Sequence, residues 1–244
     1  MKGIKYRFLA LITLLTLQVN YCYAKITKTE ELSSLVENLQ NKNQQKNLNP
    51  KLAATQLLET IDKLYVTMPP GSITKDMQGT LWFLKGQSYT TLQQYEKAIK
   101  SFDQSIKYDP NNLSSYSNIG YILNQQGKYK ESISISDLLI KKNKCFINAF
   151  INKGYSLLGL FKYQEAIDIF DIARQLDIDN LTVYLGYAKG YAGLKRYDKA
   201  VEIYDGIIKY FGKKGQGTPQ FKILQALRKE QELLVQKQAN PMIK

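Results

Sequence analysis

Hydrophobic and polar positions in this chain recur with the spacing of amphipathic helices, and the helices recur with a longer period of 34 residues. At that spacing Tyr95 falls on Tyr129, Tyr163 and Tyr197 without an insertion or a deletion. The remaining columns keep small or aromatic side chains: Gly86, Gly120, Gly154 and Ala188; Ala98, Ser132, Ala166 and Ala200; Trp82, Tyr116, Phe150 and Tyr184; and Phe102, Ser136, Phe170 and Tyr204. The pattern predicts four consecutive units, at residues 79–112, 113–146, 147–180 and 181–214.

Each unit has the composition of two antiparallel helices. Small residues such as Gly86 and Ala98 would lie where the two helices approach most closely, and Tyr95 and Phe102 would fill the space beside them. Polar pairs such as Gln93 and Gln94 separate the two helices of a unit. Because one pair cannot bury its apolar face alone, we expect neighbouring pairs to stack and share a core.

These columns resemble the tetratricopeptide repeat (TPR), a 34-residue helix pair with Trp, Leu, Gly, Tyr, Ala, Phe, Ala and Pro at set positions. The resemblance covers residues 79–212. It implies an all-α fold, a right-handed superhelical solenoid of antiparallel helix pairs with flanking capping helices. The residues that match the motif in the first unit are Trp82, Gly86, Tyr89, Ala98, Phe102 and Pro110, and those in the third are Phe150, Gly154, Tyr163, Ala166, Phe170 and Ala173. The departures are Ser136 at an aromatic position and Lys144 and Ile178 at the closing proline.

Both flanks are predicted to be helical but outside the repeat phase. Residues 25–78 form a helical segment that is either a cap or a degenerate repeat, because Pro50 falls where a first helix would run. A second helix there begins at Pro50 and carries one apolar stripe, at Leu57, Leu58, Ile61, Leu64 and Tyr65. Residues 215–244 contain a helix that starts at Pro219, and we expect it to cap the stack. A partner-binding arm is the alternative for that helix.

The first 24 residues have the order of a secretory signal. Three basic residues, at positions 2, 5 and 7, precede an apolar run from Phe8 to Val19, and small residues stand at Cys22 and Ala24. The apolar run is shorter than the roughly 20 residues that a membrane-spanning helix needs. We therefore predict a signal peptide at residues 1–24 and a periplasmic or secreted protein. An uncleaved anchor, the one route to a membrane, is the alternative.

Composition argues against catalysis. The sequence contains no histidine, the commonest general base and metal ligand, and only two cysteines, Cys22 and Cys145. Without Cys22, Cys145 is the sole thiol, and we expect it to be buried. No Gly-rich phosphate loop precedes a helix. We therefore predict no enzyme activity, no catalytic residues, no cofactor and no metal.

The chain is basic, with 34 Lys and Arg against 21 Asp and Glu, a formal charge of +13. Loss of residues 1–24 would leave 31 against 21, or +10. Such a charge favours anionic partners. A second hypothesis is therefore a binder of anionic envelope polymer or nucleic acid, although no aromatic residues are predicted on an exposed basic face, which disfavours nucleic acid.

The leading hypothesis is a non-catalytic scaffold or assembly factor that binds a peptide or helix of another protein. In TPR proteins the first helices of successive repeats line a concave groove. Asn118 and Asn152 would either grip a peptide backbone there or bridge neighbouring helices, since both use the same carboxamide bonds. Oligomeric state is not predicted. By resemblance, the residues that face the groove are Phe83, Gln87, Asn118, Tyr121, Asn124, Ile151, Asn152, Tyr155, Leu158 and Lys189.

Overall fold

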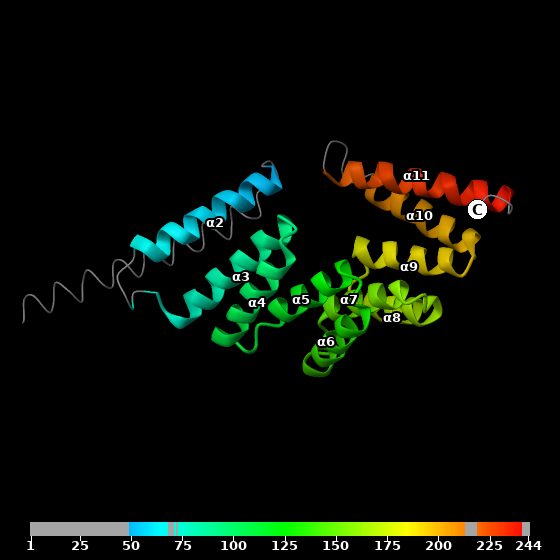
Figure 1. Ribbon diagram of the computed structural model, residues 1–244. Helices are drawn as coiled ribbons and strands as arrows, with labels where there is room; N and C mark the ends of the chain where they lie inside the picture. The colour runs from blue at the N-terminus through cyan, green and yellow to red at the C-terminus, as the bar shows by residue number, and fades with distance from the viewer. Residues whose placement is uncertain (1–48, 68–70, 72, 213–218, 241–244) are drawn as a thin grey trace, which may run out of the picture. The chain divides into compact units, whose positions relative to one another are not determined.

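A computed structural model describes residues 49–67, 71, 73–212 and 219–240, and all regular structure in these ranges is helical (Figure 1). The predicted signal peptide and the first part of the amino-terminal segment lie outside the described residues. No described helix combines the length and apolar composition needed to cross a membrane. In chain order the helices are α2 (Pro50–Thr67), α3 (Lys75–Thr91), α4 (Tyr95–Tyr108), α5 (Leu113–Gln125), α6 (Tyr129–Lys142), α7 (Ile147–Gly159), α8 (Tyr163–Leu176), α9 (Leu181–Gly193), α10 (Tyr197–Gly212) and α11 (Pro219–Ala239).

The helix boundaries repeat every 34 residues. Helices α5, α7 and α9 begin at residues 113, 147 and 181, and α4, α6, α8 and α10 begin at 95, 129, 163 and 197. The first helix of the first pair differs, because it begins at Lys75 and not at Gly79. Thr74 is the reason, since its hydroxyl accepts a hydrogen bond from the Met77 N–H at 3.3 Å and caps the helix there. Gly79 therefore lies inside the helix.

The turn within each pair contains a residue in the left-handed region. Gln93, Phe161 and Lys195 have φ values of 60°, 59° and 60°, and Gly127 has 74°. In each turn the next backbone N–H reaches back to the helix, as from Gln94 to the Tyr89 carbonyl at 2.9 Å. This geometry matches a Schellman-type helix end, which usually takes glycine at the left-handed position. Only the second pair has glycine at this position. In the other three turns a residue with a side chain adopts the same conformation, so the two helices that the turn joins must impose it.

The described residues form two compact units, one up to Ser115 and one from Tyr116 onward, and each is described by itself. In the first unit, α2 lies against α3. Leu57, Ile61 and Leu64 of α2 pack on Leu81 and Leu84 of α3, and these five side chains are buried. The expected apolar stripe of the amino-terminal segment is thus the face that meets the first repeat helix.

In the second unit, glycines of the first helices face aromatic rings of the second helices. A Cβ atom at Gly154 would lie 2.6 Å from Cζ of Phe170, and one at Gly186 would lie 2.2 Å from the same atom. Phe170 is fully buried between them. Tyr129, a member of the tyrosine column, lies in the same way against Gly159, where a Cβ would stand 2.3 Å from the ring. The tyrosines of this column are half-buried packing residues.

One junction replaces this packing with a different one. Where the third pair has Phe170, the second has Ser136, which is fully buried and donates a hydrogen bond to the Ser132 carbonyl at 2.8 Å. Where Gly186 faces Phe170, the corresponding residue of the preceding junction is Asn152, which is 7% exposed. At this junction a small second-helix residue is therefore matched by a larger first-helix residue.

The second unit ends with α11 packed along α10 (Figure 1). Leu234 of α11 is buried with Tyr204 and Ile207 of α10 and with Ala188 and Ala200. The Gln231 carboxamide donates a hydrogen bond to the Asp205 carboxylate. These contacts cover α10 on the side where a further repeat would stack.

The expectation that Cys145 is buried is wrong. The residue is exposed in the turn between α6 and α7, and its backbone N–H donates to the Asn143 side-chain oxygen at 2.9 Å. Turns between stacked pairs lie on the surface because their backbone groups need solvent or local side-chain partners. The thiol is therefore accessible.

Candidate protein-interaction surface

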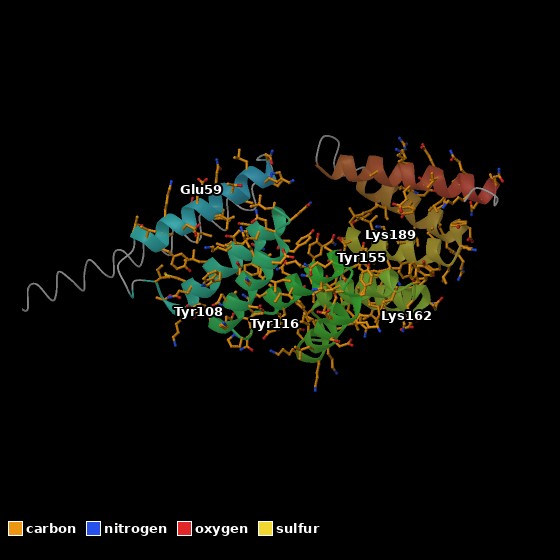
Figure 2. The ribbon with its side chains drawn as sticks, viewed as in Figure 1. Glu59, Tyr108, Tyr116, Tyr155, Lys162 and Lys189 are labelled. Carbon is orange, nitrogen blue, oxygen red and sulfur yellow. The ribbon has the colours of Figure 1, made fainter. Side chains whose placement is uncertain are left out.

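The predicted groove residues of the second unit come from the three first helices α5, α7 and α9. Tyr121, Tyr155 and Lys189 occupy the same position of successive pairs, 34 residues apart. Figure 2 places Tyr155 and Lys189 next to each other, and the Lys189 ammonium lies 5.9 Å from the centre of the Tyr155 ring. We call Asn118, Tyr121, Tyr155 and Lys189 the first-helix surface.

Tyr155 is the best anchored member of this surface. Its hydroxyl donates a hydrogen bond to the Thr182 carbonyl at 3.1 Å, which joins α7 to the start of α9. Its ring meets Phe170 edge-on, with 5.3 Å between the ring centres. The half-buried ring is therefore held in place before any partner binds, which lowers the entropy cost of binding.

Tyr121 and Lys189 are the exposed members. Tyr121 exposes 44% of its surface, and Lys189 is also exposed. Asn118 is half-buried one helical turn before Tyr121. Together these side chains offer an aromatic face, hydroxyl and carboxamide groups and one cation.

Asn152 is not part of this surface, and the bridging alternative applies to it. Its carboxamide donates to the Ser117 carbonyl at 2.8 Å and to the Ser117 hydroxyl at 3.2 Å. Asn124 completes the network, because it donates to the Asn152 carbonyl at 2.9 Å and accepts from the Ser156 hydroxyl at 2.6 Å. The sequence predicted helix bridging by Asn152 as one of two alternatives, but not the parts of Ser117, Asn124 and Ser156. Asn124 and Asn152 thus fasten α5 to α7.

The other predicted residues are partly or wholly committed to packing. Ile151 and Leu158 are half-buried and pack on the core cluster around Phe170. Phe83 and Gln87 belong to α3 in the first unit and are half-buried. The Phe83 ring lies 5.7 Å from the ring of Phe102. These side chains therefore contribute mainly to packing and offer little exposed area to a partner.

Burial raises the pKa of several tyrosines among the described residues. Burial, with a smaller contribution from the Glu230 carboxylate of α11, raises the pKa of Tyr155 to about 12. Burial and the neighbouring Tyr191 raise the pKa of Tyr187 to about 12. In the first unit, burial, followed by the charges of Tyr108 and Asp62, raises the pKa of Tyr65 to about 12. These three hydroxyl groups therefore keep their protons well above physiological pH.

These shifts predict alkaline destabilisation. Between pH 10 and pH 12 the unfolded chain loses tyrosine protons that the folded chain retains, so the free energy of unfolding falls as the pH rises through this window. We expect the urea midpoint at pH 11 to be lower than at pH 9, and part of the phenolate absorbance to appear only near pH 12. The Tyr155→Phe variant should lose one of the late-titrating groups. Titration of every tyrosine near pH 10 would contradict this prediction.

Comparison with known proteins agrees with this geometry. A family model described as TPR repeat matches residues 86–127. The chain is similar in fold to the MamA 41-end structure from Desulfovibrio magneticus RS-1, with 13% identity, a TM-score of 0.58 and coverage of 78% of this chain and 98% of the other. It is also similar to a thermophilic TPR protein of Thermus thermophilus, with 13% identity, a TM-score of 0.51 and coverage of 54% and 73%. Comparison with curated protein sequences gives no match.

The 34-residue helix pairs and the structural likeness give the described residues a tetratricopeptide-repeat fold, and residues 86–127 match the family model. This fold is that of a protein–protein interaction scaffold, and its members are generally not catalysts. The solved structures establish the fold alone, because their identity to this chain is low.

Proposed function

We propose that this protein is a non-catalytic scaffold or assembly factor of the cell envelope that binds a peptide or helix of a partner protein on the first-helix surface. The observation that carries the proposal is the row of Tyr121, Tyr155 and Lys189 at one position of three successive pairs. The network of Asn124 and Asn152 fastens α5 to α7, two of the three helices that carry this row. Side chains at a regular spacing on packed helices would suit a ligand with regular secondary structure, such as an extended peptide or an α-helix.

The spacing of the helices suggests how a partner would match the row. Packed helices lie about 8–10 Å apart, and an extended chain advances about 3.3 Å per residue. Every third residue of an extended peptide would therefore meet the next member of the row. An α-helix rises about 1.5 Å per residue, so its contacts would lie about seven residues apart. In both cases Lys189 would favour an acidic residue at one end of the segment.

The envelope location rests on the sequence of residues 1–24. A basic start, an apolar run of about a dozen residues and a small residue at position 24 have the order of an export signal. The proposal is that this segment directs export to the periplasm or the medium. Detection of the chain in the cytoplasm after fractionation, at its full 244-residue mass, would overturn this part of it.

The binding surface can be tested by capture from envelope extract of the source cells. We expect the full chain to retain a partner protein at about 0.5 M NaCl, where the screening length is only about 4 Å. The double variant Tyr121→Ser, Lys189→Ser should lose that protein. The matched control is Ile172→Ser, Lys141→Ser, which also removes one exposed apolar side chain and one exposed lysine, but from second helices. Equal retention by both variants would refute the proposed surface.

The alternative is a binder of anionic envelope polymer or nucleic acid, and the formal charge of +10 that remains after loss of residues 1–24 favours it. Binding of this kind weakens steeply with salt, because it releases counterions. Recovery of an anionic polymer that salt removes equally from the native chain and both variants would establish this function. The first-helix surface would then have no part in binding.

A further inference from the structure

A shallow depression of about 710 Å³ lies between α3 and α4, in the first unit. Trp82 and Tyr89 line it from α3, and Lys97, Lys100 and Lys107 line it from α4. All three of these α4 lysines are exposed. Together with Lys85, the lining contains four lysines against one acidic residue, Asp103, a formal charge of +3. We call this feature the basic depression.

The three lysines form one stripe along α4. Their spacings of three and seven residues place them on the same face of a helix. None of them forms an ion pair with a carboxylate among the described residues, although Glu96 and Asp103 stand four residues before Lys100 and Lys107. The stripe is therefore not an internally compensated helix face.

The stripe is also not a requirement of the repeat. The corresponding residues are Glu131, Ser134 and Lys141 in the second pair, Glu165, Asp168 and Gln175 in the third, and Lys199, Glu202 and Lys209 in the fourth. The formal charge of these three positions is thus +3 in the first pair and 0, −2 and +1 in the others. Since the fold accepts all of these charges, packing does not explain the lysines of α4.

Lys85 differs from the three α4 lysines because its charge is paired within the protein and its side chain is largely buried. Its ammonium forms an ion pair with Asp62 of α2 at 2.7 Å and lies 5.1 Å from the centre of the Trp82 ring. Its side chain is 13% exposed. Lys85 thus forms the wall of the depression next to α2, and the exposed lysines of α4 are the groups that a ligand would meet.

We propose that the basic depression binds an acidic peptide segment of a partner protein. The distance from Lys97 to Lys107 along the helix is about 15 Å, because an α-helix rises about 1.5 Å per residue. An extended segment of about five residues covers the same length. Carboxylates spaced along that segment would meet the three ammonium groups. The carboxamide of Gln104, which also lines the depression, can donate to and accept from its backbone.

The aromatic rings favour a peptide over nucleic acid. Binding of single strands requires open ring faces on which bases stack. Here the Lys97 ammonium covers the Tyr89 ring at 5.6 Å, and Lys85 and Tyr65 both lie on Trp82, Tyr65 with 6.4 Å between ring centres. Asp103 inside the lining also opposes a ligand with a continuous run of phosphates. The rings therefore support the lysines and do not form a stacking platform.

Trp82 makes the site directly measurable, because it is the only tryptophan in the sequence. The probe is a fluorescein-labelled Glu-Ala peptide of about twelve residues, whose extended length of about 40 Å exceeds the stripe. It is titrated with the full chain at about 50 mM NaCl, where the screening length is above 10 Å. We expect saturable binding by anisotropy, and the unlabelled peptide should change the Trp82 emission with the same midpoint.

Two triple variants distinguish the depression from the general charge. Lys97→Gln, Lys100→Gln, Lys107→Gln should weaken peptide binding at least tenfold. The control Lys130→Gln, Lys141→Gln, Lys144→Gln removes the same charge from exposed sites of the second unit and should change it less than twofold. Equal losses from the two triples would overturn the proposal. An oligothymidylate of the same length that binds more tightly, and is lost with the same triple, would assign the depression to nucleic acid instead.

The basic depression belongs to the first unit and the first-helix surface to the second, so each site can be tested without the other. The variant Lys97→Gln, Lys100→Gln, Lys107→Gln changes only the first unit, so it should lose the acidic peptide and still retain any protein that is captured through the first-helix surface. A chain that binds this peptide but captures no protein through the first-helix surface would leave the basic depression as the only binding site supported by experiment.

Discussion

Replacement of Ala166 by arginine is expected to unfold the second unit of the protein. Ala166 of α8 is fully buried in a cluster with Phe150, Phe170 and Val183. Overpacking costs about 1–3 kcal/mol, and an unpaired buried charge adds several kcal/mol. The sum is comparable with the whole stability of a typical domain, about 5–15 kcal/mol. Loss of the helical circular dichroism signal during a thermal or urea titration measures the effect.

The matched control adds the same side chain two residues earlier. Gln164 of α8 is exposed, and Gln164→Arg disturbs only its hydrogen bond to Asp168. We expect the control to melt within a few degrees of the native chain, as surface substitutions usually change stability by less than about 0.5 kcal/mol. If Ala166→Arg melted like Gln164→Arg, the assignment of Ala166 to the interface between helices would be wrong.

The position of Ala166 shows why so much of this fold could be predicted from sequence. In every pair this position holds a small residue, because the backbones of the two helices come close together there. Ala98 and Ala200 belong to the same column and are also fully buried. A repeat therefore supplies several copies of each packing constraint, and their common spacing marks the helix boundaries. A constraint that acts once in the chain, such as the Thr74 cap that starts α3 at Lys75, has no second copy to reveal it.

The candidate site was less predictable for the same reason. The groove positions were assigned by resemblance to the repeat family. Resemblance indicates which face of a helix a residue occupies, but not whether its side chain is already bonded to a neighbouring helix. Asn118 and Asn152 share one repeat position, yet only Asn152 is buried, and its side chain is hydrogen-bonded to Ser117. The basic depression was missed because its lysines are peculiar to one pair, and an average over repeats removes such a signal.

The junction at Ser136 and Asn152 predicts that two unfavourable substitutions will compensate each other. Ser136→Phe alone should destabilise the protein by about 1–3 kcal/mol, because the ring would need space that the Asn152 side chain occupies. Asn152→Gly alone should cost about 2–4 kcal/mol. It removes the hydrogen bonds to Ser117, introduces a helical glycine and leaves a cavity.

The double variant recreates the arrangement of the next junction, where Phe170 is enclosed by Gly154 and Gly186. A phenylalanine at position 136 would lie between Gly120 and the new glycine, so we expect it to recover about 1–3 kcal/mol relative to the sum of the single changes. A double-mutant cycle of urea unfolding measures this coupling. If the losses of unfolding free energy were additive, the side chains at positions 136 and 152 would not compete for the same space. Ser136 and Asn152 would then be independent departures from the repeat.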